Sequence, residues 1–468
     1  MTTTATSARQ RLDPALVRLT LIMMVGVLAV VFDTTIVNVA LDTLGRSLGV
    51  GVATVQWVTT AYLLALGVAV PVTGWLMDRW GGKRVWMAAL AVFLIGSIGA
   101  SLAVDAPTLI AARVVQGVGG GLMLPVMTTL LVQAAGGRML GRAVALVSMP
   151  IVVGPVLGPF LGGLIVAHLS WRWIFWVNVP FCVAGLLLAW RFMPALPGSR
   201  RSRLDVVGLA LITPGIAAVV FALSRATDGF GHATVLVPLA AGLGLLAAFT
   251  ARAWRRGGDA LVDVRLFRIG SFSAASGLLF LSGFSLYGGM LLVPLYFQQV
   301  RGASALAAGL LIAAQGVGVL VSRGLAGSLT DRIGARWVTF AGLVVVAVAT
   351  VPFALAGDHT SRWWLVPALA VRGVGLGAVT VPVMTSAYIG LDKPSVPHAS
   401  IITRVAQQIG GSFGTAVLAV ILAREVAAHP AVHAFQVAFW WSIAFTAAAL
   451  FLTVRLPVAA PAGEGPAA

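Results

Sequence analysis

Charged side chains are scarce in this 468-residue sequence, and acidic ones are the fewer. Asp and Glu total 14 against 31 Lys and Arg, and charged residues make up only 10% of the chain while hydrophobic ones make up 59%. A water-soluble globule needs more polar surface than this to cover its core. The composition therefore excludes a soluble globular protein, and lipid must cover most of the surface.

Several classes of site are excluded by what the sequence does not contain. The one cysteine, Cys182, lies in an apolar run without a partner, which rules out an intramolecular disulfide and a cysteine metal cluster. No Gly-x-x-x-x-Gly-Lys-Ser/Thr motif and no loop long enough for a nucleotide-binding domain occur, so ATP hydrolysis is excluded. We therefore expect no enzyme, no catalytic residue, no metal and no cofactor. The six histidines fall in or near loops without metal-ligand spacing: His168, His232, His359, His398, His429 and His433.

Apolar runs as long as a membrane span recur along the whole chain. A span takes about 20 residues, and windows such as Val85 to Val104 contain no charged residue. We predict an all-α polytopic membrane protein with fourteen spans. The first span is retained rather than cleaved as a signal peptide, because it is too long and contains Asp33. The predicted spans are 19–41, 55–77, 84–104, 107–131, 141–166, 173–193, 206–224, 233–251, 273–298, 303–326, 337–357, 363–389, 402–423 and 434–454.

The net charge of +17 reflects membrane topology rather than nucleic-acid binding. A nucleic-acid site needs its basic residues clustered on one folded surface, whereas here they lie in short loops between apolar runs. With the N-terminus inside, most of them fall on one side, among them Arg79, Lys83, Arg84 and Arg404, and few fall on the other, such as Arg46 and Arg172. This positive-inside pattern, with an even number of spans, predicts that both termini are cytoplasmic.

Two internal repeats predict that the chain arose by duplication. A charged loop motif after the second span of each half recurs at constant offset, and a tetrapeptide recurs verbatim. We therefore expect two six-helix bundles, 1–198 and 265–468, separated by an inserted pair of spans, 199–264. The repeated residues are Gly74, Asp78, Arg79, Gly81 and Lys83 with Gly327, Asp331, Arg332, Gly334 and Arg336, and Pro125-Val126-Met127-Thr128 with Pro382-Val383-Met384-Thr385.

Further motifs lie in the first six spans. They are Phe32 to Leu41, Gln56-Trp57 with Tyr62, Gly74 to Arg84, Arg113 with Gln116-Gly117, Gly154-Pro155, Gly158-Pro159, Gly162-Gly163, and Trp171 to Phe175 followed by Asn178-Val179-Pro180. In these motifs the sequence resembles the major facilitator superfamily, and within it the fourteen-span drug:proton antiporters of the EmrB/QacA type, over nearly the whole chain. The resemblance implies the major facilitator fold and proton-coupled efflux of small apolar or amphipathic compounds, such as drugs or antibiotics, by alternating access across the cytoplasmic membrane. It also implies a protein that works as a monomer with a small-molecule substrate, protons and the lipid bilayer as its partners.

Asp33 is the strongest candidate for the proton site. It is the only acidic residue well inside a predicted span, where a charge is costly unless it faces a cavity or a partner. Burial and a nearby cation shift the proton affinity of a carboxyl in opposite directions, so such a group can exchange a proton near neutral pH. The resemblance assigns Arg113 to proton coupling. A purely structural ion pair is the alternative.

Charged residues at the repeated loops are candidates for gating contacts between the bundles, although plain membrane anchoring by the basic ones is the alternative. These residues are Asp78, Arg79, Lys83, Arg84, Asp331 and Arg332. In span 141–166, glycines four residues apart allow close helix approach, and prolines loosen the backbone. This antiporter helix motif, which could be a tight contact or a hinge, comprises Gly154, Pro155, Gly158, Pro159, Gly162 and Gly163.

Adaptable and hydrogen-bonding side chains inside the spans are candidates for the wall of a substrate cavity. Lipid contact or a bond to a helix backbone is the alternative for each. The candidates are Asn38, Gln56, Tyr62, Gln116, Met123, Tyr287, Gln315 and Met384. In the second half we expect Arg372 to be a buried cation and Arg323 to reach the membrane interface, and the alternative for Arg323 is a part in substrate choice or gating. An importer or sodium-coupled carrier of the same fold, and less readily a channel or receptor, remain alternative functions.

Overall fold

The computed structural model describes residues 14–50, 52–135, 158, 161–162, 164–166, 168–194, 204–225, 231–257, 260–303, 305–357, 360–392 and 395–457. Within these residues all regular secondary structure is helical, and thirteen helices are long and apolar enough to cross a membrane. The predicted span 141–166 falls mostly outside them. Large apolar side chains face outward around the bundle, and Trp363 is 89% exposed. The all-α prediction is confirmed, and the chain is a multi-pass membrane protein.

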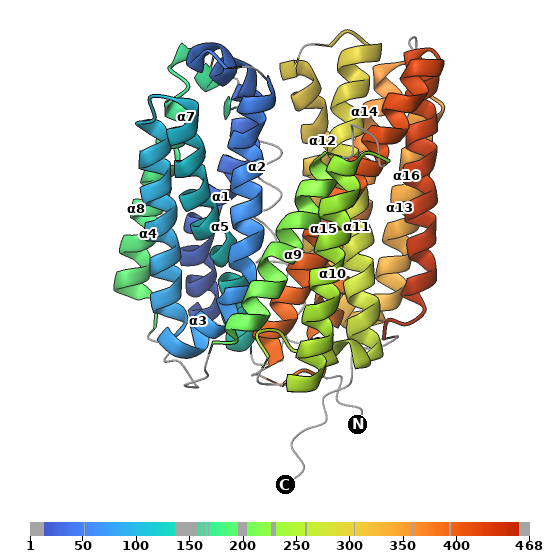
Figure 1. Cartoon of the computed structure of the whole chain (residues 1–468). Coiled ribbons are helices and arrows are strands. Elements are labelled where there is room, and N and C mark those ends of the chain that lie inside the picture. The colour runs from blue at the N-terminus through green and yellow to red at the C-terminus, as the bar shows by residue number, and fades with distance from the viewer. Residues whose placement is uncertain are drawn as a thin grey trace, which may run out of the picture.

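The helices form two groups that stand side by side, with a further pair against them (Figure 1). The first group contains α1 (Pro14–Leu48), α2 (Val52–Ala69), the short 3₁₀ turn Val70–Val72, α3 (Thr73–Trp80), α4 (Gly82–Ser101), α5 (Ala106–Ala135), α7 (Trp173–Trp176) and α8 (Asn178–Phe192). The second contains the 3₁₀ turn Val264–Arg268, α11 (Gly270–Leu295), the π-helical turn Tyr296–Val300, α12 (Ala305–Ile333), α13 (Ala335–Ala354), α14 (Arg362–Tyr388), α15 (Val396–Ala428) and α16 (Ala431–Thr453). The further pair is α9 (Val206–Ser224) and α10 (Ala233–Arg256), of which α9 packs on α2 and α15.

The repeated loop motif builds the same connection in both groups. Gly81 and Gly334 have φ angles of 81° and 85°, which glycine adopts without strain, and each is followed directly by a helix, α4 or α13. Lys83 then donates to two carbonyl oxygens at the end of α8, at 2.8 and 2.9 Å. Arg336 donates in the same way to the end of α16, where the Leu456 carbonyl accepts at 3.0 Å. Both cations therefore satisfy the last carbonyls of a helix in their own group rather than bridging the two groups.

The two groups share a hydrophobic core at one end only. One core cluster contains residues of both groups, among them Leu130 and Ile401, whereas two other clusters each lie within a single group. At the shared end, Ser400 Oγ donates to the Pro125 carbonyl at 3.5 Å, and Gly74 lies against Ile401. We call this the closed end and the opposite one the open end, where the groups stand apart in Figure 1.

Asp205 joins the two helices of the additional pair. Its carboxylate caps α9 by accepting from the Gly208 amide at 3.0 Å, and it also accepts from Arg252 at 3.1 Å and Arg256 at 2.9 Å on α10. Burial alone would raise the pKa of Asp205, but the hydrogen bond from Gly208 and the two arginine charges outweigh burial and lower that pKa. The ionised carboxylate therefore stabilises the pair.

Two substitutions at Asp205 should separate its capping role from its charge. Asp205→Asn keeps an N-cap acceptor and loses only the ion pairs with two partly exposed arginines. It should therefore lower the free energy of unfolding by less than about 1 kcal/mol. Asp205→Ala also removes the cap and should cost about 1 to 2 kcal/mol more. Because the pKa of Asp205 is lowered in the folded protein, the difference in unfolding free energy between wild type and Asp205→Asn should be largest above about pH 5 and should shrink at lower pH. Thermal unfolding in nanodiscs measures both effects, and equal melting temperatures for all three proteins would contradict the assignment.

Candidate functional site

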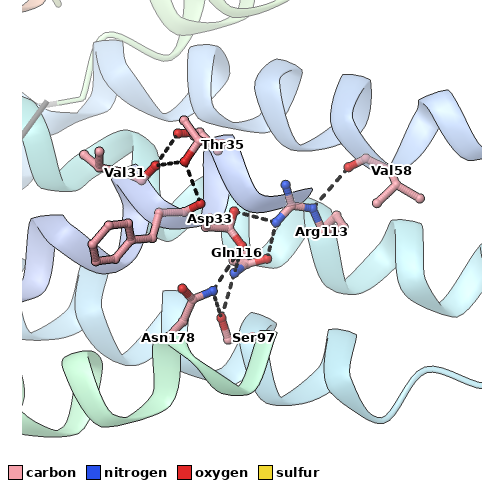
Figure 2. A network of polar contacts seen from close by, with 10 residues as sticks. Val31, Asp33, Thr35, Val58, Ser97, Arg113, Gln116 and Asn178 are labelled. Carbon is pink, nitrogen blue, oxygen red and sulfur yellow. Dashed lines mark hydrogen bonds and ion pairs between the residues drawn. The ribbon is translucent and has the colours of Figure 1, made fainter. Parts of the chain in front are cut away.

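Five polar side chains from four helices meet inside the first group (Figure 2). Each is at most 1% exposed. Asp33 comes from the middle of α1, Ser97 from α4, Arg113 and Gln116 from adjacent turns of α5, and Asn178 from the start of α8. Polar groups this deeply buried must satisfy one another, because neither lipid nor apolar side chains can.

Asp33 is fully hydrogen-bonded by donors. Its Oδ2 atom accepts from Arg113 Nη1 at 2.6 Å, and its Oδ1 atom accepts from Gln116 Nε2 at 2.9 Å and Asn178 Nδ2 at 3.1 Å. Ser97 Oγ in turn accepts from the same two amides, at 2.6 and 3.1 Å. A carboxyl that meets three donors and no acceptor is matched to its ionised form. The structure therefore holds Asp33 as a carboxylate paired with a guanidinium.

Arg113 is held by more than its ion pair. Its Nη1 atom also donates to Gln116 Oε1 at 2.6 Å, and its Nε atom donates to the Val58 carbonyl of α2 at 3.1 Å. The guanidinium carbon lies 4.0 Å from the centre of the Tyr62 ring, which gives a cation–π contact. Arg113 therefore has several partners in addition to Asp33.

Two glycines allow the helices to approach closely enough for these contacts. A Cβ atom on Gly96 of α4 would lie 2.5 Å from the backbone nitrogen of Gln116, so α4 and α5 touch backbone to backbone beside Ser97. A Cβ atom on Gly117 would lie 2.5 Å from the Tyr62 carbonyl, so α5 and α2 touch there as well. Any larger residue would push the polar groups out of hydrogen-bonding distance.

A cavity of about 400 Å³ lies between the two groups, next to this network. Arg113 and Tyr62 line it from the first group, and Tyr287 and Arg404 line it from the second. Asp33 does not line it. Arg113 is therefore the side chain that connects the buried carboxylate with the cavity.

The structure divides the predicted cavity residues. Tyr62 and Tyr287 line the cavity. Gln116 and Met123 are fully buried within the first group, and Met384 packs on the core shared at the closed end, so these three do not line the cavity in this structure. Because the spans are apolar on every side, the sequence alone did not distinguish a cavity-facing methionine from a core methionine.

In the second group, a buried arginine again meets polar partners. Arg372 of α14 donates to Gln315 Oε1 at 2.6 Å, to Thr350 Oγ1 at 3.2 Å and to the Ser285 carbonyl at 2.9 Å. Gln315, predicted as a cavity residue, lines a separate pocket of about 50 Å³. Arg323 lines that pocket too and is only 5% exposed, so the expectation that it reaches the membrane interface is wrong.

The glycine motif is only partly within the described residues. A Cβ atom on Gly158 would lie 2.0 Å from Thr35 Oγ1, and one on Gly162 would lie 3.2 Å from the Ile36 carbonyl, so these two glycines pack directly on α1 beside Asp33. Several predicted residues cannot be placed in the same way. Outside the described residues lie Gly154, Pro155, Pro159 and Gly163, together with the side chains of Asn38, Gln56 and Asp331.

The remaining gating candidates lie at the closed end. Arg79 stands 5.9 Å from the ring of Trp75 on its own helix, and Arg84 and Arg332 are exposed. Asp78 is half-buried at the end of α3. The two groups meet nearby through small residues and the start of α15 rather than through Lys83, which binds the end of α8.

Three functional-site residues were not among the predicted ones. Asn178 lay in a recognised motif, and its polar side chain in an apolar run was a usable signal. Ser97 gave none, because a serine in a span usually bonds its own helix backbone. Arg404 was counted as a topological charge just inside the predicted span 402–423, but α15 begins at Val396, which places Arg404 two turns inside the helix and at the cavity.

Two of the histidines, which the sequence placed in loops without metal-ligand spacing, lie beside a carboxylate in the structure. Glu425, His429 and His433 offer one ligand atom each, and these atoms all lie within 4.8 Å of one another where α15 passes into α16. Glu425 and His429 approach to 3.1 Å. The cluster is partly to fully exposed, and its contacts do not reach the buried network.

Comparison with known proteins agrees with this architecture. The multidrug resistance protein B homolog of Mycobacterium tuberculosis strain H37Rv is 36% identical over 418 residues, covering 88% of this chain and 77% of that protein. The lincomycin resistance protein LmrB of Bacillus subtilis strain 168 is 30% identical over 425 residues, covering 90% and 88%. A crystal structure of a double-tryptophan mutant of XylE shares the fold, with a TM-score of 0.68 at 15% identity and coverage of 95% and 97%. A profile of the Major Facilitator Superfamily matches residues 23–415 and again 275–467, and the chain therefore belongs to that superfamily.

Proposed function

We propose that this protein is a proton-coupled exporter of small apolar or amphipathic compounds, of the fourteen-span drug:proton antiporter type. The observation that carries the proposal is the buried Asp33–Arg113 pair, in which the arginine also lines the central cavity. Relatives named for multidrug resistance and lincomycin resistance, at 36% and 30% identity, support drug export. Protons and an apolar substrate are the partners of this cycle, and no cofactor takes part.

The proposed cycle uses the ion pair as a proton-operated latch. A proton that reaches Asp33 neutralises the carboxylate and removes its attraction for Arg113. The guanidinium keeps its proton and retains the Gln116 oxygen, the Val58 carbonyl and the Tyr62 ring as partners. Because Arg113 lines the cavity, its change of environment is transmitted to the substrate site. Loss of the proton on the other side restores the pair and completes one exchange.

We propose that the closed end faces the cytoplasm. The basic residues Arg79, Arg84 and Arg332 lie at this end, as the positive-inside pattern requires. Both termini are then cytoplasmic, the structure corresponds to an outward-facing state in the cytoplasmic membrane, and a monomer is the working unit.

Alternating access follows from rocking of the two bundles, 1–198 and 265–468, around the cavity. Residues of α9 and α10 are not among the described residues that line it. The insert 199–264 therefore supports the bundles from outside, and the direct transport path runs between them.

Replacing Asp33 by asparagine should uncouple transport from the proton gradient. A carboxamide of nearly the same size cannot exchange a proton, so pH-gradient-driven efflux should be abolished while substrate exchange without a gradient continues. The measurement is flux of a fluorescent substrate in proteoliposomes of wild type and Asp33→Asn. Asp105→Asn is the matched control, because Asp105 is an exposed loop carboxylate bonded to Thr108.

Three outcomes would contradict the assignment. Normal coupling in a correctly inserted Asp33→Asn protein would remove Asp33 as the proton site. Flux driven by a sodium gradient would favour a sodium-coupled carrier, and accumulation in the direction of the proton gradient would favour an importer. Flux that ignores every gradient would indicate a channel.

A disulfide across the closed end should stop transport. An ideal Cβ at Gly74 lies 3.7 Å from the Cβ of Pro397, within the range of about 3.5 to 4.5 Å that disulfides need. We expect the double variant Gly74→Cys/Pro397→Cys to cross-link on mild oxidation, lose flux and regain it with reductant, because the closed end must part in each cycle. Each single variant under the same oxidant is the control, and full flux in the cross-linked protein would contradict alternating access at this contact.

A further inference from the structure

The central cavity is lined by two arginines and by no acidic residue among the described residues. Arg113 lines it from α5 and Arg404 from α15. The sequence contains no Asp or Glu between residues 105 and 205 or between 263 and 331. The segment of the first bundle that follows α5 therefore has no carboxylate to add to this wall, and neither have α11 and most of α12.

The two arginines differ in how their charge is balanced. Arg113 is paired with Asp33 at 2.6 Å. Among the described residues, Arg404 has one polar partner: its Nη1 atom donates to the amide oxygen of Gln407 at 3.3 Å. It forms no ion pair with any carboxylate of those residues. Among the described residues, two guanidinium charges and one carboxylate give the site a net charge of one positive unit. A proton on Asp33 raises that to two, so the site is positive in both states of the proposed cycle.

Arg404 stands at the inner end of a polar stripe on α15. Gln408, Ser412 and Thr415 follow it at helical spacing, and all three line the same cavity. One turn before Arg404, Ser400 contacts α5 at the closed end. The guanidinium is therefore at the floor of the site, with the stripe leading from it towards the open end.

The opposite walls supply an apolar surface. Leu63, Leu66 and Leu124 line the cavity from the first group, and Leu286 and Met290 line it from the second. A compound with an aromatic or aliphatic body can fill this part while its polar end meets the stripe. A positive charge in a site of low dielectric repels a cation strongly, and a guanidinium binds carboxylate, sulfonate or carbonyl oxygens with directional hydrogen bonds.

We propose that Arg404 sets the charge selectivity of the cavity, so that the protein takes neutral and anionic amphipathic compounds with an oxygen acceptor at one end and excludes permanent cations. This inference rests on the proposed function only in treating the cavity as the substrate site. Arg404 acts by direct contact with the substrate, whereas Asp33 and Arg113 carry the proton coupling.

Three probes with one naphthalene body test the proposal by binding. They are naphthalene-2-sulfonate, naphthalene-2-sulfonamide and (naphthalen-2-ylmethyl)trimethylammonium, with charges of −1, 0 and +1. Calorimetry with the full chain in nanodiscs, with empty nanodiscs subtracted, should show the ammonium probe binding at least about tenfold more weakly than the sulfonate. Arg404→Gln should weaken the sulfonate by about tenfold, strengthen the ammonium probe and leave the sulfonamide within a few-fold of wild type.

Two further variants keep the test sharp. Arg404→Lys retains the charge and should retain the exclusion of the ammonium probe, although sulfonate affinity falls because the two-pronged hydrogen bonding is lost. Arg255→Gln removes the same charge at an exposed position on α10 and should leave the affinities for all three probes unchanged. Equal binding of the sulfonate and ammonium probes to wild type, no binding of the sulfonate, or an unchanged ratio in Arg404→Gln would overturn the proposal.

Flux of the sulfonamide probe separates this inference from the proposed function. If a pH gradient drives efflux of that neutral probe but the probes bind in the wrong order of charge, the role of Arg404 is refuted and the exporter function stands. The expected charge preference in binding without any gradient-driven efflux would keep the role of Arg404 and remove the exporter.

Discussion

The buried ion pair between Asp33 and Arg113 is the constraint on which the first bundle depends. Two charges removed from water cost more than their mutual attraction returns unless every remaining donor and acceptor is satisfied. Gln116 and Asn178 donate to the second oxygen of Asp33, and Ser97 accepts from both amides. These side chains come from three helices and reach the pair because Gly96 and Gly117 let backbones touch. Polar residues that would destabilise a membrane span singly are therefore stable as one connected set.

The second bundle repeats the scaffold without the carboxylate. Tyr62 and Gln315, and likewise Ser97 and Thr350, are each 253 residues apart, and each member of these pairs contacts the buried arginine or the network of its own bundle. Where the first bundle has Asp33, however, Arg372 meets the Ser285 carbonyl. A carbonyl accepts a hydrogen bond but cannot take up a proton in the physiological range. In the proposed cycle, proton exchange therefore belongs to the first bundle, and the second contributes a further arginine to the cavity wall.

The sequence of apolar helices predicts where polar residues lie along the chain but not which way apolar side chains point. Most span positions, the internal repeat and the burial of Asp33 and Arg113 could be predicted from the sequence, because rare polar residues stand out against an apolar background. Side-chain direction was not readable, since a helix that is apolar all round carries no periodic signal for its buried face. Met123 was therefore expected at the cavity but lies in the core. The location of Arg404 was predicted wrongly for another reason: α15 starts six residues before the predicted boundary, so Arg404 lies deeper in the helix.

The contacts at the closed end explain how such a bundle can move without breaking its charged core. Even an added Cβ atom on Gly74 would reach Ile401 only at ordinary van der Waals distance, and Ser400 makes only a long hydrogen bond of 3.5 Å to Pro125. These contacts are weak enough to part and re-form within a transport cycle. The ion pair, by contrast, lies wholly within the first bundle, so rocking of the bundles leaves it intact. A proton can therefore influence the rocking only through a side chain that belongs to both environments. Of the two charges, Arg113 alone lines the cavity between the described parts of the bundles, and under the proposed mechanism the coupling must pass through it.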